Sequence, residues 1–100
     1  TVYRHLTILI QSKLIEKEGV ISSLRLDAIL SDVYKLSRSS AQKLIFEGSA
    51  FVNSRKIIQN AYSCQNGDII SVRHFGKFQI ETEGKLTKKG RIKCKYMVYS

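Results

Sequence analysis

Cationic and hydroxyl side chains gather where the chain passes from one predicted helix to the next. Ser37, Arg38 and Ser39 precede an apolar helical pattern, so they are expected at a helix amino terminus. The backbone N–H groups at such a terminus are unpaired and carry partial positive charge, which favours a bound phosphate. The hydroxyls could donate further hydrogen bonds, and Arg38 could add a bidentate contact. These residue types therefore predict binding of a partner that carries phosphate groups.

More candidate residues are expected around the same corner, at a helix start, one helical turn further along, or in a turn between strands. Asn53 is expected to stabilise its turn before it contacts a ligand. Side chains cannot enter the deep major groove of double-helical RNA, so its recognition relies on phosphates, 2′-hydroxyls and shape. A basic rim is suited to this mode, with little sequence preference. The candidate RNA-binding residues of the corner are Arg25, Ser37, Arg38, Ser39, Gln42, Lys43, Asn53, Arg55 and Lys56.

A second basic run lies near the carboxy terminus. Residues 85–95 contain six basic side chains and no acidic one. We expect a second phosphate contact here, with an ordinary charged hairpin as the alternative. The candidates in the last quarter of the chain are Lys77, Lys88, Lys89 and Arg91.

Several corner residues also have a purely structural interpretation. Asp27 is expected to cap its helix, or to pair with Arg25 or Arg38, in preference to contacting RNA. Ser39 and Gln42 are three residues apart, as in a capping box. Arg38 and Lys43 on an exposed helix face could simply be solvated.

The excess of positive charge narrows the choice of partner. The 100 residues include 17 Lys and Arg against 8 Asp and Glu, a net charge of +9. Residues 51–100 hold 10 basic and 3 acidic side chains, whereas residues 1–50 hold 7 and 5. Concentrated charge raises the potential felt by a polyanion, so nucleic acid, an anionic membrane or an acidic protein are the candidates. Solubility alone is the alternative explanation.

Other function classes find little support in the sequence. Cys64 and Cys94 form no Cys-x-x-Cys pair, so we expect two reduced, buried thiols, with no metal site and no cofactor. There is no Gly-rich phosphate loop and no nucleophile with a matching base, so we expect no enzyme activity. No apolar run reaches the roughly 20 residues of a membrane span, and no signal peptide is recognisable, which favours a cytoplasmic protein without a membrane partner.

Hydrophobic periodicity predicts short helices followed by strands, an α+β fold class. Apolar spacing predicts helices over 2–14 and 27–34, although 14–17 could equally form a strand. Another short helix is expected to end at Gly48, a residue type that tolerates the left-handed conformation. The expected strands are 51–52, 56–58, 68–73, 77–83 and 91–99. Short helices should therefore pack on a small, mainly antiparallel twisted sheet.

Five short motifs occur in a fixed order over about half of the chain. They are Arg25-Leu26-Asp27-Ala28-Ile29-Leu30, Ser37-Arg38-Ser39-Ser40-Ala41, Leu44-Ile45 with Gly48, Val52-Asn53, and Gly67-Asp68-Ile69-Ile70-Ser71-Val72. Together they resemble the RNA-binding module named after small-subunit ribosomal protein S-four. This resemblance implies the S-four-like (alpha-L) fold and binding to structured RNA.

The flanking residues extend the resemblance to about residues 20–93. They are Ser22-Ser23-Leu24, Ser71-Val72-Arg73, Gly84 and Thr87-Lys88-Lys89-Gly90-Arg91. They resemble the carboxy-terminal part of the YlmH family, which includes the bacterial ribosome-quality-control factor RqcP and plastid relatives. The resemblance implies a factor on the large ribosomal subunit that contacts ribosomal RNA and a peptidyl-tRNA. Ala50, Ser54 and 74–77 depart from the S-four pattern, so the RNA contacts need not be identical.

The expected domain organisation follows from this resemblance. Residues 1–19 would form an amino-terminal helix, the tail of a preceding domain, and 20–100 the S-four-like domain with a carboxy-terminal strand extension. We expect a monomer that binds rRNA or tRNA on the large ribosomal subunit, in a bacterial cytoplasm or a plastid. The alternatives are a protein-interaction or membrane-surface adaptor, or the RNA-targeting accessory domain of an RNA-modifying enzyme.

Overall fold

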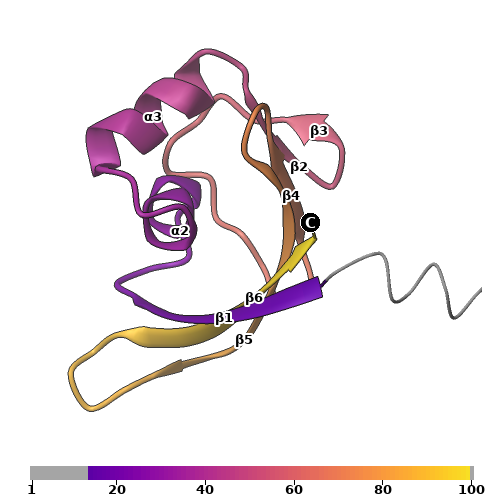
Figure 1. Cartoon of the computed structure of the whole chain (residues 1–100). Helices are drawn as coiled ribbons and strands as arrows, with labels where there is room; N and C mark the ends of the chain where they lie inside the picture. The colour runs from indigo at the N-terminus through magenta and orange to yellow at the C-terminus, as the bar shows by residue number, and fades with distance from the viewer. Residues whose placement is uncertain (1–13, 100) are drawn as a thin grey trace, which may run out of the picture.

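Two helices cover one face of a six-stranded sheet in the computed structural model, which describes residues 14–99 (Figure 1). The helices are α2 (Leu26–Val33) and α3 (Arg38–Phe46). The strands are β1 (Leu14–Ile21), β2 (Ala50–Val52), β3 (Arg55–Lys56), β4 (Ile69–Val72), β5 (Gly76–Leu86) and β6 (Ile92–Tyr99). Their order in the sheet is β1-β6-β5-β4-β2-β3, and every neighbouring pair is antiparallel. The predicted α+β class and antiparallel sheet are confirmed.

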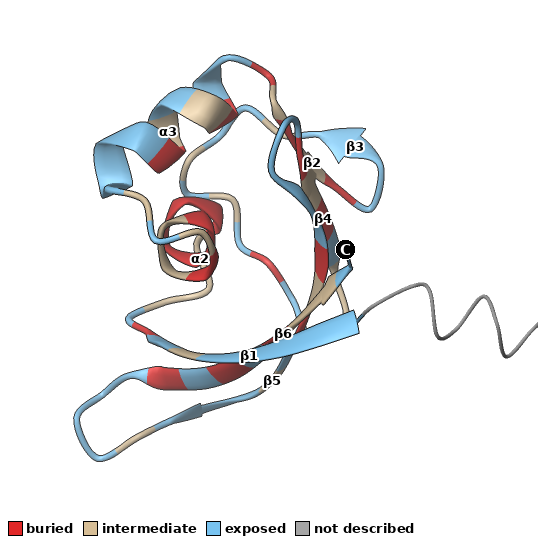
Figure 2. Ribbon diagram, viewed as in Figure 1, coloured by how far each residue is buried: buried red, intermediate tan, exposed pale blue. Residues whose placement is uncertain are grey.

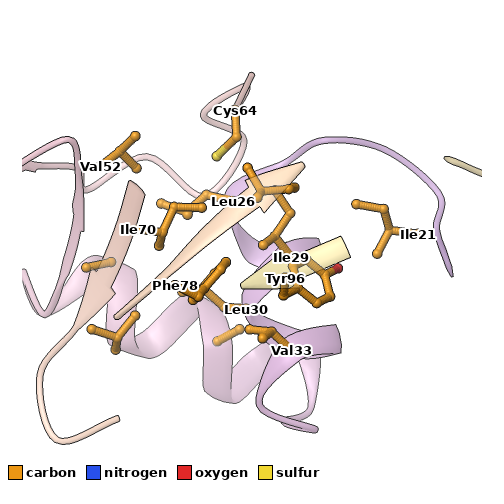
Figure 3. Close-up of a cluster of buried hydrophobic side chains, with 14 of the residues drawn as sticks. Ile21, Leu26, Ile29, Leu30, Val33, Val52, Cys64, Ile70, Phe78 and Tyr96 are labelled. Atoms are coloured by element: carbon orange, nitrogen blue, oxygen red, sulfur yellow. The ribbon is translucent and has the colours of Figure 1, made fainter. Parts of the chain in front are cut away.

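The two helices differ in how much of their surface they bury. Six of the eight residues of α2 are buried, including Leu26, Ile29 and Leu30, which are completely inaccessible and belong to the core (Figures 2 and 3). Helix α3 buries only Ala41 and Ile45. Removing apolar surface from water is the main stabilising term, so α2 anchors the helical layer. Helix α3 is left at the edge of the molecule with most of its polar side chains in solvent.

Buried and exposed side chains alternate along β5 and β6, and the buried ones form the sheet side of the core. Phe78 and Ile80 on β5, and Cys94 and Tyr96 on β6, are buried beneath the helices. The rings of Phe78 and Tyr96 meet edge to face, with centroids 5.6 Å apart, an arrangement that aromatic pairs favour. The Tyr96 hydroxyl also donates a hydrogen bond of 2.8 Å to Asp32 Oδ2 on α2, which fixes the helix against β6.

The sequence left open whether residues 14–17 form a helix or a strand, and the structure shows that they begin the strand β1. It pairs along its whole length with β6, from Leu14 opposite Tyr99 to Ile21 opposite Ile92. The strand therefore crosses residue 20, where the boundary between two domains was expected. The rest of the helix predicted over 2–14 lies outside the described residues.

Both cysteines are free and buried. Burial, together with the nearby charge of Asp68, raises the pKa of the Cys64 thiol to about 12. Burial also raises the pKa of the Cys94 thiol. The prediction of two buried, unbridged thiols is confirmed, and both are protonated at neutral pH.

Candidate nucleic-acid interface

One buried carboxylate organises the basic corner. Asp27 on α2 is completely inaccessible to solvent. Arg25 donates from Nε to Asp27 Oδ1 and from Nη2 to Asp27 Oδ2, both at 3.0 Å. The Nη2 atom of Arg38 lies 3.5 Å from Asp27 Oδ1, and Gln42 Nε2 donates to Asp27 Oδ2 at 3.0 Å. Asp27 thus pairs with both arginines, one of the two roles expected for it, and gathers residues from the start of α2 and from α3. The other expected role is wrong, because Arg25 is the N-cap of α2 and no side chain caps the helix.

These partners determine the charge state of Asp27. Burial by itself would raise the pKa of the carboxyl group. Hydrogen bonds from Gln42 and Arg25, and the positive charge of Arg38, outweigh this effect and hold the pKa of Asp27 below its ordinary value. The carboxylate is therefore ionised at neutral pH. Because the side chains of Arg25 and Arg38 remain 42% and 46% exposed, both can still contact a ligand.

Hydroxyl groups surround the amino terminus of α3, beside this cluster. The Oγ atom of Ser37 accepts a hydrogen bond of 3.1 Å from the backbone N–H of Ser40, so Ser37 is the N-cap. Ser39 Oγ lies 3.2 Å from Ser37 Oγ, and all three serines are exposed. The prediction of a capping box formed by Ser39 and Gln42 is wrong, because Ser37 caps the helix and Gln42 donates to Asp27 instead.

The turn between β2 and β3 carries a second group of candidates. Asn53 and Ser54 both have positive φ angles, 51° and 70°, as in a type I′ turn. Asn53 donates to Asp68 Oδ1 at 3.0 Å and accepts from the N–H of Ile69 at 2.9 Å. Its role in stabilising the turn is therefore confirmed. Arg55 follows the turn as an exposed residue of β3.

Lys56 connects this turn to the far end of α3. Its side chain lies against Gly48, just beyond the carboxy terminus of the helix. A helix rises about 1.5 Å per residue, so Arg38 and Lys56 lie at opposite ends of a helix about 12 Å long. Lys43 is exposed on the last turn of the same helix. The basic residues thus follow the length of α3 and do not converge on one point.

The remaining candidates lie on strand β5 and in the β5–β6 connection. Lys88 and Lys89 are exposed in the turn of the β5–β6 hairpin, and Arg91 precedes β6. Lys77 alternates with the buried Phe78, so it lies on the sheet face away from the helices. The structure therefore does not bring Lys77 together with the corner residues.

Two basic residues near the candidates were missed in the sequence. Lys35 follows α2 with a positive φ of 55° and is exposed. The guanidinium carbon of Arg73 lies 5.9 Å from the centre of the Phe51 ring, a cation–π contact. Helical periodicity ends before Lys35, and the contact of Arg73 depends on strand pairing, so the periodicity of the sequence marks neither residue as part of the basic surface.

The described residues contain no cluster of His, Cys, Asp and Glu side chains able to hold a metal ion. Between Leu14 and Tyr99, no helix is long and apolar enough to cross a membrane.

The sequence is similar to a ribosome-associated protein. Over 73 residues, 72% of this chain, it is 36% identical to the ribosome-associated protein quality control protein P2 of Bacillus subtilis. This similarity supports a relationship with the YlmH family. The chain spans about a quarter of that relative, 28% of its length. No protein-family model matches the chain.

Proposed function

We propose that this chain is an S-four-type RNA-binding module of the YlmH family that binds structured ribosomal or transfer RNA through phosphates and shape. The observation that carries the proposal is the buried carboxylate of Asp27, which holds Arg25 and Arg38 beside the serine-rich start of α3. A buried ion with several satisfied partners fixes side-chain geometry, and fixed guanidinium groups match phosphate oxygens well.

Three kinds of phosphate-binding group occur side by side at this corner. The guanidinium groups supply charge, Ser37 and Ser39 supply hydroxyls, and the start of α3 supplies unpaired N–H groups with the positive end of the helix dipole. Contacts to phosphate carry no sequence information by themselves. The mode of recognition that we propose is therefore that of a double-helical RNA backbone.

The ribosomal part of the proposal is supported by the relative in Bacillus subtilis, whose name places it in ribosome-associated quality control. We extend this to binding of the large ribosomal subunit by a monomeric module in a bacterial cytoplasm or a plastid. The module itself would carry no catalytic activity and no cofactor.

Replacement of Arg38 and Lys43 by Ala tests the proposed site. Binding of the full chain to a synthetic RNA stem–loop, measured across a salt series, should weaken at least about tenfold, and the log–log salt slope should fall by roughly 1.5 for two lost phosphate contacts. The variant Lys17→Glu lowers the net charge by the same two units at an exposed position of β1 and serves as the control. Equal affinities of the double variant and this control would place the site elsewhere.

An adaptor for a membrane or an acidic protein would behave differently. Binding to vesicles of anionic lipid in preference to the RNA stem–loop, under the same salt conditions, would contradict the proposal. An RNA affinity that does not change with salt would contradict it as well.

A further inference from the structure

A small groove lies between the corner and the β5–β6 hairpin. It has a volume of about 300 Å³ and is bounded by the end of β1, by α2, by the first residue of α3 and by the residue before β6. In Figure 1 the start of α3, the connection from β1 to α2 and the hairpin tip all lie at the left of the molecule. The groove therefore joins two basic segments that are far apart in the sequence.

Positive charge dominates the groove. Lys35, Arg38 and Arg91 line it, against one carboxylate, that of Asp32. Asp32 Oδ2 already accepts a hydrogen bond of 2.8 Å from the buried Tyr96 hydroxyl, so part of its capacity as an acceptor is used inside the protein. The three cationic side chains come from three different segments and face a common space. Such an arrangement suits an anion that bridges them.

Hydroxyl groups add to this lining. Ser22 and Ser31 both border the groove. The Ser31 hydroxyl donates to the carbonyl oxygen of Leu36 at 2.6 Å, which ties the residues after α2 back to the helix and places Lys35 at the groove. Ser22 is exposed, so its hydroxyl can donate to a ligand.

We propose that this groove binds a backbone phosphate of RNA between Lys35, Arg38 and Arg91, and so connects the corner and the hairpin into one continuous RNA track. The inference rests on the proposed function and deepens it. It adds Lys35 to the binding residues and gives Arg91 a specific contact. It also makes Arg38 the shared element, because Arg38 belongs to both the Asp27 cluster and the groove.

The double variant Lys35→Ala/Arg91→Ala tests the groove separately from the corner. Affinity for the RNA stem–loop should fall about tenfold or more, with a decrease of roughly 1.5 in the salt slope. The control Lys17→Glu on β1 lowers the net charge by the same two units outside both basic segments and should change affinity by less than about threefold. If the groove variant binds like this control while Arg38→Ala/Lys43→Ala loses affinity, the groove is excluded and the proposed function stands. If neither the groove variant nor the corner variant differs from the control, both proposals fail.

A cleavage experiment gives a readout that does not depend on net charge. Both native thiols are buried and have raised pKa values, so a thiol-specific iron chelate should label only an introduced surface cysteine. From Lys35→Cys, hydroxyl radicals should cut the bound RNA stem–loop in one short segment, and Arg91→Cys should cut an overlapping segment. Lys17→Cys should give background cleavage. Background cleavage from position 35, with the RNA still bound, would overturn the groove proposal.

Discussion

Replacement of Asp27 by Asn separates the effect of geometry from the effect of net charge. The substitution keeps the size of the side chain, but one acceptor oxygen becomes an NH₂ donor. If Oδ2 is replaced, the hydrogen bonds from Arg25 Nη2 and Gln42 are lost; if Oδ1 is replaced, the bond from Arg25 Nε and the contact with Arg38 are lost. Hydrogen bonds to charged groups contribute about 1.5–3 kcal/mol each, and the partial exposure of both arginines reduces this. We expect a loss of about 2 kcal/mol in the free energy of unfolding.

The same substitution should weaken RNA binding although it raises the net charge from +9 to +10. Charge alone would strengthen binding to a polyanion. Loss of the fixed positions of Arg25 and Arg38 should instead reduce affinity about tenfold, or about 1.4 kcal/mol. Glu47→Gln, an exposed change at the end of α3, adds the same charge without touching the cluster and is the matched control. Fluorescence anisotropy with an RNA stem–loop, well below the melting temperature of both variants, gives the comparison. If Asp27→Asn binds as tightly as Glu47→Gln, the reasoning about this cluster is refuted.

Other predictions concern the stability of the elements that position the site. Because the pKa of Asp27 is lowered in the folded state, the ionised carboxylate stabilises the fold fully above its unfolded-state pKa, near 4, and this stabilisation is lost as pH falls through the folded-state pKa. Urea titrations between pH 3 and 7 should show a loss of unfolding free energy at acid pH in the wild type and a smaller loss in Asp27→Asn. Ser54→Gly should raise the midpoint of urea unfolding by an amount equivalent to about 1 kcal/mol, because Ser54 has a φ of 70° that glycine adopts without strain, and a lower midpoint would contradict this. Tyr96→Phe removes the hydrogen bond to Asp32 and should cost about 1–2 kcal/mol by the same assay, with an unchanged midpoint counting against the role of that bond.

The sequence predicted the elements whose pattern is set by local burial. Leu26, Ile29 and Val33 follow helical spacing because one side of α2 lies on the sheet. Phe78 and Ile80 alternate because one face of β5 is covered. The pairing of Asp27 with Arg25 was also predictable, since two residues of opposite charge two positions apart at a helix start lie within reach of each other.

Features that depend on distant contacts could not be predicted in the same way. Strand β1 has both apolar and charged residues in solvent, since Leu14 and Ile15 are about half exposed, and only its pairing with β6 makes it a strand. The capping-box prediction is wrong because Gln42 donates its hydrogen bond to the buried carboxylate of Asp27, 15 residues away. The groove brings Lys35 and Arg91 together across 56 positions of sequence, through packing that no local pattern encodes.

Co-sedimentation with separated ribosomal subunits tests the central claim most directly. The chain should travel with the large subunit at low salt, should be released progressively as salt rises, and should be released at lower salt when Arg38 and Lys43 are replaced by Ala. The Lys17→Glu variant should follow the wild type closely. A chain that stays free of the large subunit at every salt concentration would contradict the account.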